Sequence, residues 1–198
     1  MNEDILKLKL SLEEKTPTLL LGFSFGAVNG IGEQIPLGNT LVKKLYKYMF
    51  IDNPPCKEIL EEDKEGAEQY KKVGDLKGLC GLLRDEGRLS ERNEYLTNIF
   101  EGATIDETNK VYNIGKYKWD KIFTLNIDCL LENIFEQTGV SYKVWNRDND
   151  DRRNESSSTL IVKLHGCVKN KKAGYIFDEE EYINFLKSQR AKNEENDK

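Results

Sequence analysis

The sequence predicts an α/β domain in which helices flank a parallel sheet. Two observations favour this fold class: strand-like segments alternate with segments of helical periodicity, and the first strand-like segment is almost wholly apolar. Alternation of strands and helices is typical of parallel sheets. An apolar strand is typical of a sheet that is covered on both faces. We expect residues 1–198 to form one such domain.

Four segments have the composition of strands. They are "TLLLGF" at 18–23, "KIFTLN" at 121–126, "SYKVW" at 141–145 and "LIVKLH" at 160–165. The last three mix polar and apolar residues but are rich in β-branched and aromatic side chains, which favour strands. We therefore expect a four-stranded sheet.

Helical patterns follow the strands at residues 39–50, 128–139 and 178–186. Asp128 is placed to cap the start of the second pattern, and Gly139 is suited to its end. Asp178 and Glu181 have the spacing of a capping box at the start of the third. Together with the strands, these helices predict a Rossmann-like order of elements.

Residues 55–118 interrupt that order with two amphipathic patterns, at 75–87 and 90–102, and Ser90 is a candidate cap for the second. We interpret this stretch as a helical insertion that covers the sheet, with a lid or a partner surface as the alternative. Two further segments are predicted to be irregular: a polar loop at 146–158 and a frayed tail at 188–198.

The charge argues against direct nucleic-acid binding, because the formal net charge is −5 and such binding usually depends on clustered Lys and Arg. The N-terminal residues mix acids and lysines without a long apolar run. We therefore expect neither a signal peptide nor a membrane span, and a cytoplasmic location.

The metal-ligating residue types are sparse. The chain has one histidine and four scattered cysteines, Cys56, Cys80, Cys129 and Cys167. No two cysteines have the close spacing of a typical zinc site, so the sequence predicts no metal of this kind. The same observation does not exclude a Mg²⁺ site formed by carboxylates.

Three candidate functional segments follow predicted strands. Residues 19–38 carry an apolar strand into a glycine-rich loop, which is either a phosphate site or a flexible turn. Asn126 and Asp128 follow the second strand, and they are either ligand contacts or ordinary turn and helix-cap residues. His165 ends the fourth strand, and it is either a catalytic base or a half-buried histidine with no catalytic role. Because the carboxyl ends of parallel strands share one edge, we expect all three segments to meet there.

The ordered motifs "LGFS", "IPLG", "TLNID" and "KLHG" resemble those of sirtuin-like NAD-consuming domains, especially the bacterial type of anti-phage defence proteins. The resemblance spans residues 18–183 and includes the acidic segment "FDEEEY". It implies an enzyme that hydrolyses NAD to nicotinamide and ADP-ribose, with NAD as substrate and no metal. A role in NAD depletion, and control by homo-oligomerisation or a regulatory partner, are implied by the resemblance in the same way.

The resemblance also implies roles for individual residues. Asn126 would orient the attacking water beside the nicotinamide ribose, and His165 would act as general base on a ribose hydroxyl. Asp128 would hold the nicotinamide amide, while Gly22 and Ser24 would line the pyrophosphate and adenosine side. The residues expected to bind NAD are Gly22, Phe23, Ser24, Asp128 and Gly166.

The sequence departs from the family pattern in three ways. Leu20 stands in place of the first glycine of the family's triplet, which favours an alternative, a non-catalytic nucleotide-binding or interaction module. The paired-cysteine zinc module of deacylating sirtuins is absent from these residues, which disfavours a protein deacylase. The family normally continues with a further Gly-Ser loop and strands, so we expect a fold truncated on its C-terminal side.

Overall fold

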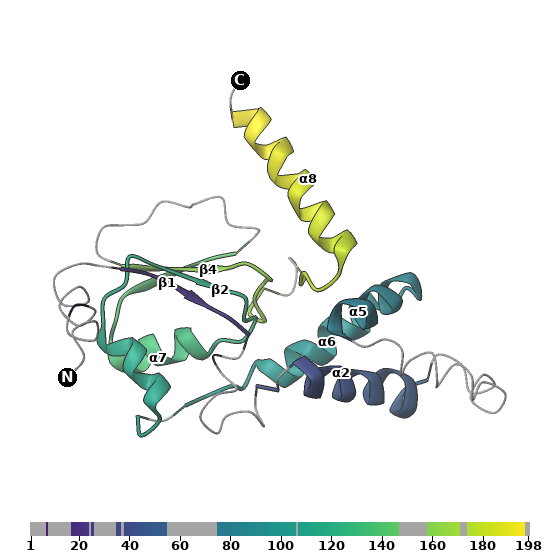
Figure 1. Cartoon of the computed structure of the whole chain (residues 1–198), viewed down its shortest axis with the longest axis horizontal. Helices are drawn as coiled ribbons and strands as arrows, with labels where there is room; N and C mark the ends of the chain where they lie inside the picture. Colours follow the sequence, from purple (N-terminus) through teal and green to yellow (C-terminus); the bar gives the residue numbers. More distant parts are fainter. Residues whose placement is uncertain are drawn as a thin grey trace. The chain divides into compact units, whose positions relative to one another are not determined.

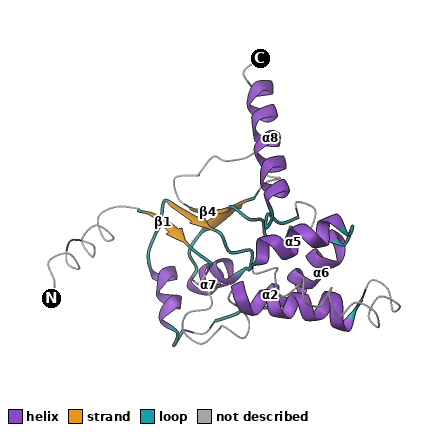
Figure 2. Cartoon of the chain, turned by 45° about the vertical axis from the view of Figure 1, so that its right-hand side comes forward, coloured by secondary structure: helices purple, strands orange, loops and turns teal. Residues whose placement is uncertain are grey.

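The structure is a computed structural model, drawn in Figures 1 and 2. It describes residues 7, 17–23, 25, 35–36, 38–54, 75–105, 107–146, 158–170 and 174–196, with side chains as far as 188. The chain divides into two compact units. The sheet unit comprises Met1–Ile35 and Thr97–Gly174, and the helical unit comprises Pro36–Leu96 and Tyr175–Lys198. The prediction that the chain forms one domain stays a prediction.

The sheet unit contains the four predicted strands, all parallel, in the order β1-β2-β4-β3. Their bounds are Thr18–Leu21 for β1, Lys121–Thr124 for β2, Tyr142–Trp145 for β3 and Thr159–Lys163 for β4. The predicted Rossmann-like α/β class is thereby confirmed. Strands β1, β2 and β4 end earlier than predicted, so that Asn126 and His165 lie in the segments that follow β2 and β4.

The register aligns the three strand ends. Leu21 pairs with Thr124, and Thr124 pairs with Lys163. These are the last residues of β1, β2 and β4. The segments that leave these strands therefore start at one level of the carboxyl edge, where open α/β sheets bind ligands.

Helix α7, Leu130–Thr138, lies along one face of the sheet (Figure 1). Ile122 and Ile161 are fully buried in the sheet, and Trp145 packs with Leu160 and Val162 in a separate core cluster. Gly139 ends α7 with a φ of 71°, which confirms its predicted role, because a left-handed residue at this position favours glycine. These buried apolar side chains hold the strands in place and thereby fix the position of the sheet's carboxyl edge.

The cap of α7 differs from the prediction in one detail. Cys129, not Asp128, occupies the N-cap position, and its side chain makes no capping bond. Asp128 nevertheless accepts a hydrogen bond from the backbone N–H of Leu130, at 2.9 Å. The carboxylate therefore binds a free N–H of the first helical turn from one residue further back.

A short 3-10 helix, η2 (Lys110–Lys116), packs against α7 at Gly115. A Cβ atom at Gly115 would lie 2.7 Å from side-chain atoms of both Ile134 and Thr138. The close approach of the two helices therefore requires a glycine there.

The helical unit contains α2 (Gly38–Tyr46), which continues as the π-helix η1 (Lys47–Asp52), α5 (Leu76–Asp85), most of α6 (Leu89–Phe100) and α8 (Glu179–Asn196). Within the described part of the predicted insertion the structure has helices α5, α6 and η2 and no strand. Ser90 is not a cap, because α6 begins at Leu89 and places Ser90 inside its first turn.

Helix α8 begins with the predicted capping box. Asp178 accepts a hydrogen bond from the Glu181 N–H at 2.9 Å, and Glu181 accepts one from the Asp178 N–H at 3.2 Å. The backbone helix then continues to Asn196, so most of the predicted frayed tail is helical. Residues with high helix propensity, such as Gln, Arg, Ala, Lys and Glu, fill that stretch and explain the difference.

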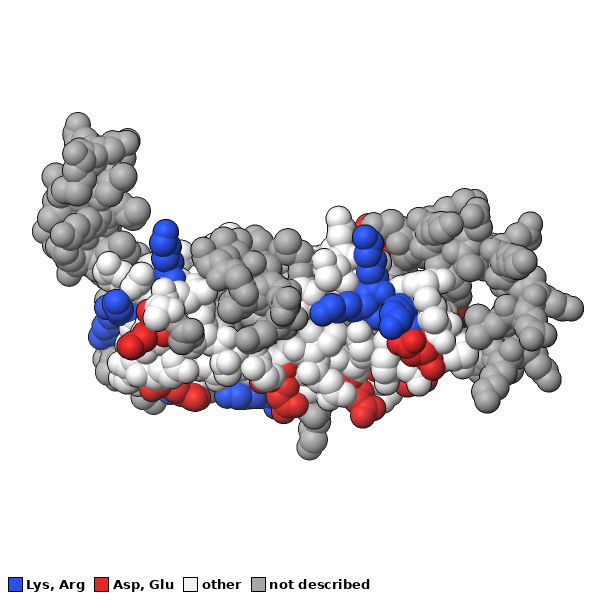
Figure 3. Space-filling view, turned by 90° about the horizontal axis from the view of Figure 1, so that it is seen from below, with Lys and Arg blue, Asp and Glu red and all other residues white. Residues whose placement is uncertain are grey.

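Two surface properties bear on binding partners. No helix within the described ranges is both long and apolar enough to cross a membrane. On the face drawn in Figure 3, basic side chains gather in small groups with acidic side chains beside them.

Candidate active site

Backbone hydrogen bonds join the loop after β2 to the end of β1 and to the loop after β4, at the carboxyl edge of the sheet. The N–H of Leu125 donates to Leu21 O at 3.3 Å, that of Leu164 to Thr124 O at 2.9 Å, and that of Val168 to Ile127 O at 2.9 Å. These bonds join the ends of β1, β2 and β4 and the segments that follow them. The loops that contain Asn126 and His165 are thereby fixed side by side.

Asn126 is the least satisfied polar side chain of this edge. Its backbone N–H donates to Thr124 Oγ1 at 3.0 Å, which fixes the turn after β2. Its side chain is only 5% exposed, and neither its amide oxygen nor its amide nitrogen has a hydrogen-bond partner among the described residues. A buried amide without partners destabilises the fold unless a ligand or an ordered water supplies them.

His165 lies in the turn after β4 and is half-buried. Its ring meets that of Phe23, from the loop after β1, edge to face with ring centroids 5.3 Å apart. The structure therefore brings two of the predicted site residues into contact across two loops. Gly166, which follows, is buried and has a φ of 101°, a conformation that favours glycine.

The structure shows fewer contacts for the remaining predicted site residues. A Cβ atom at Gly22 would meet nothing within 4 Å, so the loop is open at that point. Ser24 lies outside the described residues. Asp128 is buried, and its carboxylate is engaged with the start of α7. Burial raises the pKa of Asp128.

A family model matches the part of this edge that follows β1. Residues 120–195 match the model of the SIR2-like domain family. This segment of the chain is similar to SIR2-like domains. It contains β2, β3 and β4 with Asn126, Asp128, His165 and Gly166, whereas β1 and Phe23 precede it. No curated protein matches the chain.

The match confirms the resemblance to sirtuins that the motifs predict, while the anti-phage type stays a prediction. SIR2-like domains generally use NAD, so the match supports a function connected with NAD.

The segment matched by the family model also contains a buried polar cluster that the sequence patterns did not predict. Lys163, the last residue of β4, forms an ion pair with Glu132 of α7, with Nζ and Oε1 2.9 Å apart and both side chains almost fully buried. Lys163 also donates to the backbone carbonyl of Asp128. Burial is the largest single effect and opposes the charge of Lys163, but the Glu132 carboxylate together with the neighbouring Cys167, Asp128 and Cys129 outweighs it, so the pKa of the lysine is raised.

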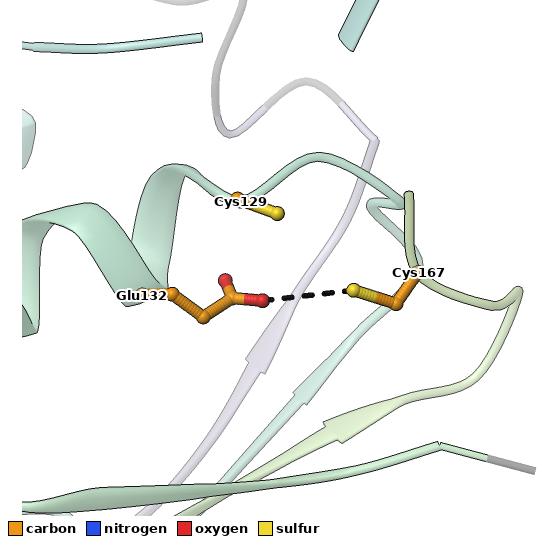
Figure 4. Close-up of side chains that lie close together, drawn as sticks. All are labelled: Cys129, Glu132 and Cys167. Carbon is orange, nitrogen blue, oxygen red and sulfur yellow. Dashed lines mark hydrogen bonds between the residues drawn. The ribbon is translucent and has the colours of Figure 1, made fainter. Parts of the chain in front are cut away.

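Cys129 and Cys167 complete this cluster beside Glu132 (Figure 4). Cys167 follows Gly166 and donates to Glu132 Oε1, with 3.8 Å between sulfur and oxygen. A hydrogen bond between the two thiols lowers the pKa of Cys167 and raises that of Cys129. The sequence signals were a lysine inside an apolar strand and the spacing Cys-x-x-Glu at the start of α7.

Proposed function

We propose that this chain hydrolyses NAD to nicotinamide and ADP-ribose at the carboxyl edge of its sheet. The observation that carries the proposal is the Asn126 side chain, a buried amide with no partner in the described part of the chain. It sits in the loop after β2, which is hydrogen-bonded to the end of β1 and to the loop after β4 that contains His165. The similarity of residues 120–195 to SIR2-like domains supports NAD as the substrate at this edge.

The proposed reaction breaks the bond between the nicotinamide nitrogen and C1′ of the ribose. The bonding electron pair goes to the nicotinamide ring, and water forms the new bond to C1′. Asn126 accepts a hydrogen bond from the water and orients it, since positioning lowers the entropy of attack. His165 takes up a proton from a ribose hydroxyl, which in turn receives the proton of the water. One proton is finally released to solvent, so the products are nicotinamide, ADP-ribose and H⁺.

The surroundings of His165 and Asn126 suit their proposed roles as base and as water-orienting residue. Histidine changes its protonation near neutral pH, as a base for this step must. The contact with Phe23 and the buried, left-handed Gly166 fix the position of the imidazole at the edge. The backbone of Asn126 is held in a turn by its bond to Thr124 Oγ1 and the residue is buried, so little reorganisation is needed when the substrate binds.

The proposal predicts that the purified chain, incubated with NAD, releases nicotinamide and ADP-ribose in equal amounts. Liquid chromatography of the reaction mixture measures both products. NAD that binds without product release would contradict hydrolysis and support the non-catalytic module, which Leu20 of β1 favours because it is 71% exposed where the family has a glycine. Nicotinamide release only in the presence of an acyl-lysine peptide would contradict hydrolysis in favour of deacylation.

The cellular part of the proposal is that the enzyme works in the cytoplasm as a homo-oligomer or with a regulatory partner, and depletes NAD in anti-phage defence. It follows from the resemblance of the motifs to that type of domain, because an enzyme that consumes NAD must be held inactive until it is needed. Cellular NAD measured during phage infection, with and without the gene, tests this part separately from the chemistry.

A further inference from the structure

We propose that Cys129, Glu132 and Cys167 form a binding site for a zinc-class divalent ion behind the carboxyl edge of the sheet. One sulfur from each cysteine and one carboxylate oxygen lie within 4.8 Å of one another. Figure 4 shows the three side chains pointing toward a common centre, two from the start of α7 and one from the loop after β4. The site is distinct from the proposed NAD site, and its residues have no part in the hydrolysis.

The distances fit a tetrahedral ion. Zinc binds sulfur at about 2.3 Å and carboxylate oxygen at about 2.0–2.2 Å, which places a sulfur and an oxygen ligand roughly 3.6 Å apart. Cys167 Sγ and Glu132 Oε1 are 3.8 Å apart. Only small side-chain movements are therefore needed to close the three donors around one ion.

The charges of the cluster balance when such an ion is bound. The two thiols lose their protons to solvent and, with the carboxylate, carry three negative charges. A divalent ion and the Lys163 ammonium, 2.9 Å from Glu132 Oε1, carry three positive charges. A neutral sum is what burial requires, since the three ligands are only 1–2% exposed.

Glu132 has the capacity for a further interaction. Its Oε1 atom contacts Lys163 and Cys167, whereas the buried Oε2 atom has no hydrogen-bond partner in the described ranges. This buried oxygen is therefore able to bind an ion without breaking a hydrogen bond. Two sulfurs with one oxygen favour zinc over Mg²⁺ or Ca²⁺, which prefer oxygen alone. The described residues supply three of the four ligands that zinc takes.

Zinc at this place would tie the first turn of α7 to the loop that holds His165 and Gly166. The metal would then act as a structural clamp on one wall of the carboxyl edge. Lys163 would act as a positioning residue, which holds the Glu132 carboxylate in place.

Elemental analysis of the purified chain, dialysed against metal-free buffer, tests the proposal. We expect about one zinc per chain in the native protein and near zero in Cys129→Ser, Cys167→Ser and Glu132→Gln. Lys163→Met should weaken zinc binding by roughly 10- to 100-fold, as for other residues that orient a ligand. The matched control is Cys80→Ser, which removes a buried cysteine of the helical unit and should retain the zinc.

A second measurement does not depend on the folding of the variants. Cobalt(II) added to the metal-free native chain should give the intense sulfur-to-metal absorption of a thiolate-bound ion, and equimolar zinc should abolish it. Absence of that band, equal loss of zinc in Cys80→Ser, or a disulfide between Cys129 and Cys167 in the purified chain would each overturn the proposal. None of these readouts depends on NAD, so failure here leaves the proposed hydrolysis to its own test.

Discussion

Asn126→Ala should slow nicotinamide release by about 100-fold or more and leave the stability of the fold unchanged or increased. Loss of one preorganised hydrogen-bonding group at a reacting centre lowers kcat by about 10²–10³-fold. Stability should not fall through lost hydrogen bonds, because the Asn126 side chain has none with the described residues. Removal of an unsatisfied buried amide relieves a penalty of about 1–3 kcal/mol, which offsets the loss of packing. Initial rates and urea unfolding, measured on one preparation, provide the comparison.

His165→Ala should lower the rate in the same assay by about 10²–10⁴-fold, the usual contribution of a general base. The matched control for both is Asn98→Ala, an exposed position on α6, which should retain native turnover. Native turnover in either site variant would contradict the proposed role of that residue. Lost turnover together with a large loss of stability in Asn126→Ala would indicate a structural asparagine instead.

Lys163→Met should destabilise the metal-free chain by about 3–5 kcal/mol, because the substitution leaves the buried Glu132 carboxylate without its counter-charge. Urea unfolding in the presence of a chelator measures this effect without a contribution from metal. The double variant Lys163→Met with Glu132→Leu should recover most of the loss, since an apolar pair of similar volume carries no buried charge.

The matched control for this prediction is Lys169→Met. Lys169 contacts Glu136 at 3.8 Å, but both side chains are more than half exposed. Such surface pairs contribute about 0–1 kcal/mol, so this variant should unfold almost as the native chain does. Equal effects of the two lysine substitutions would contradict the buried ion pair.

The strands could be predicted from the sequence because each is a short run of β-forming residues, and in a parallel sheet such runs are apolar. The C-terminal end of α7 and the start of α8 were predictable too, since Gly139 and the pair of Asp178 and Glu181 are local signals. The prediction that Ser90 caps a helix was wrong because α6 already begins at Leu89. A sequence pattern alone does not locate the end of a helix to within one residue.

The convergence of the loops was predictable as topology, since parallel strands place their carboxyl ends at one edge. The contact between Phe23 and His165, however, depends on side-chain positions that no spacing specifies. The cluster of Lys163, Glu132 and Cys167 was missed for the same reason. Its residues come from separate elements, and only the register of β2 against β4 brings those elements together.

The most direct test of the central claim, that NAD acts at the edge formed by Asn126 and His165, uses the single histidine of the chain. Proton NMR of a chain prepared without a histidine tag gives one imidazole C2–H signal, which is His165 without further assignment. The account predicts that this signal shifts and saturates when the product ADP-ribose or NAD is added to the Asn126→Ala variant, which turns over too slowly to consume the ligand. A signal that stays unchanged while calorimetry records binding of the same ligand would contradict the account, because NAD would then occupy another site.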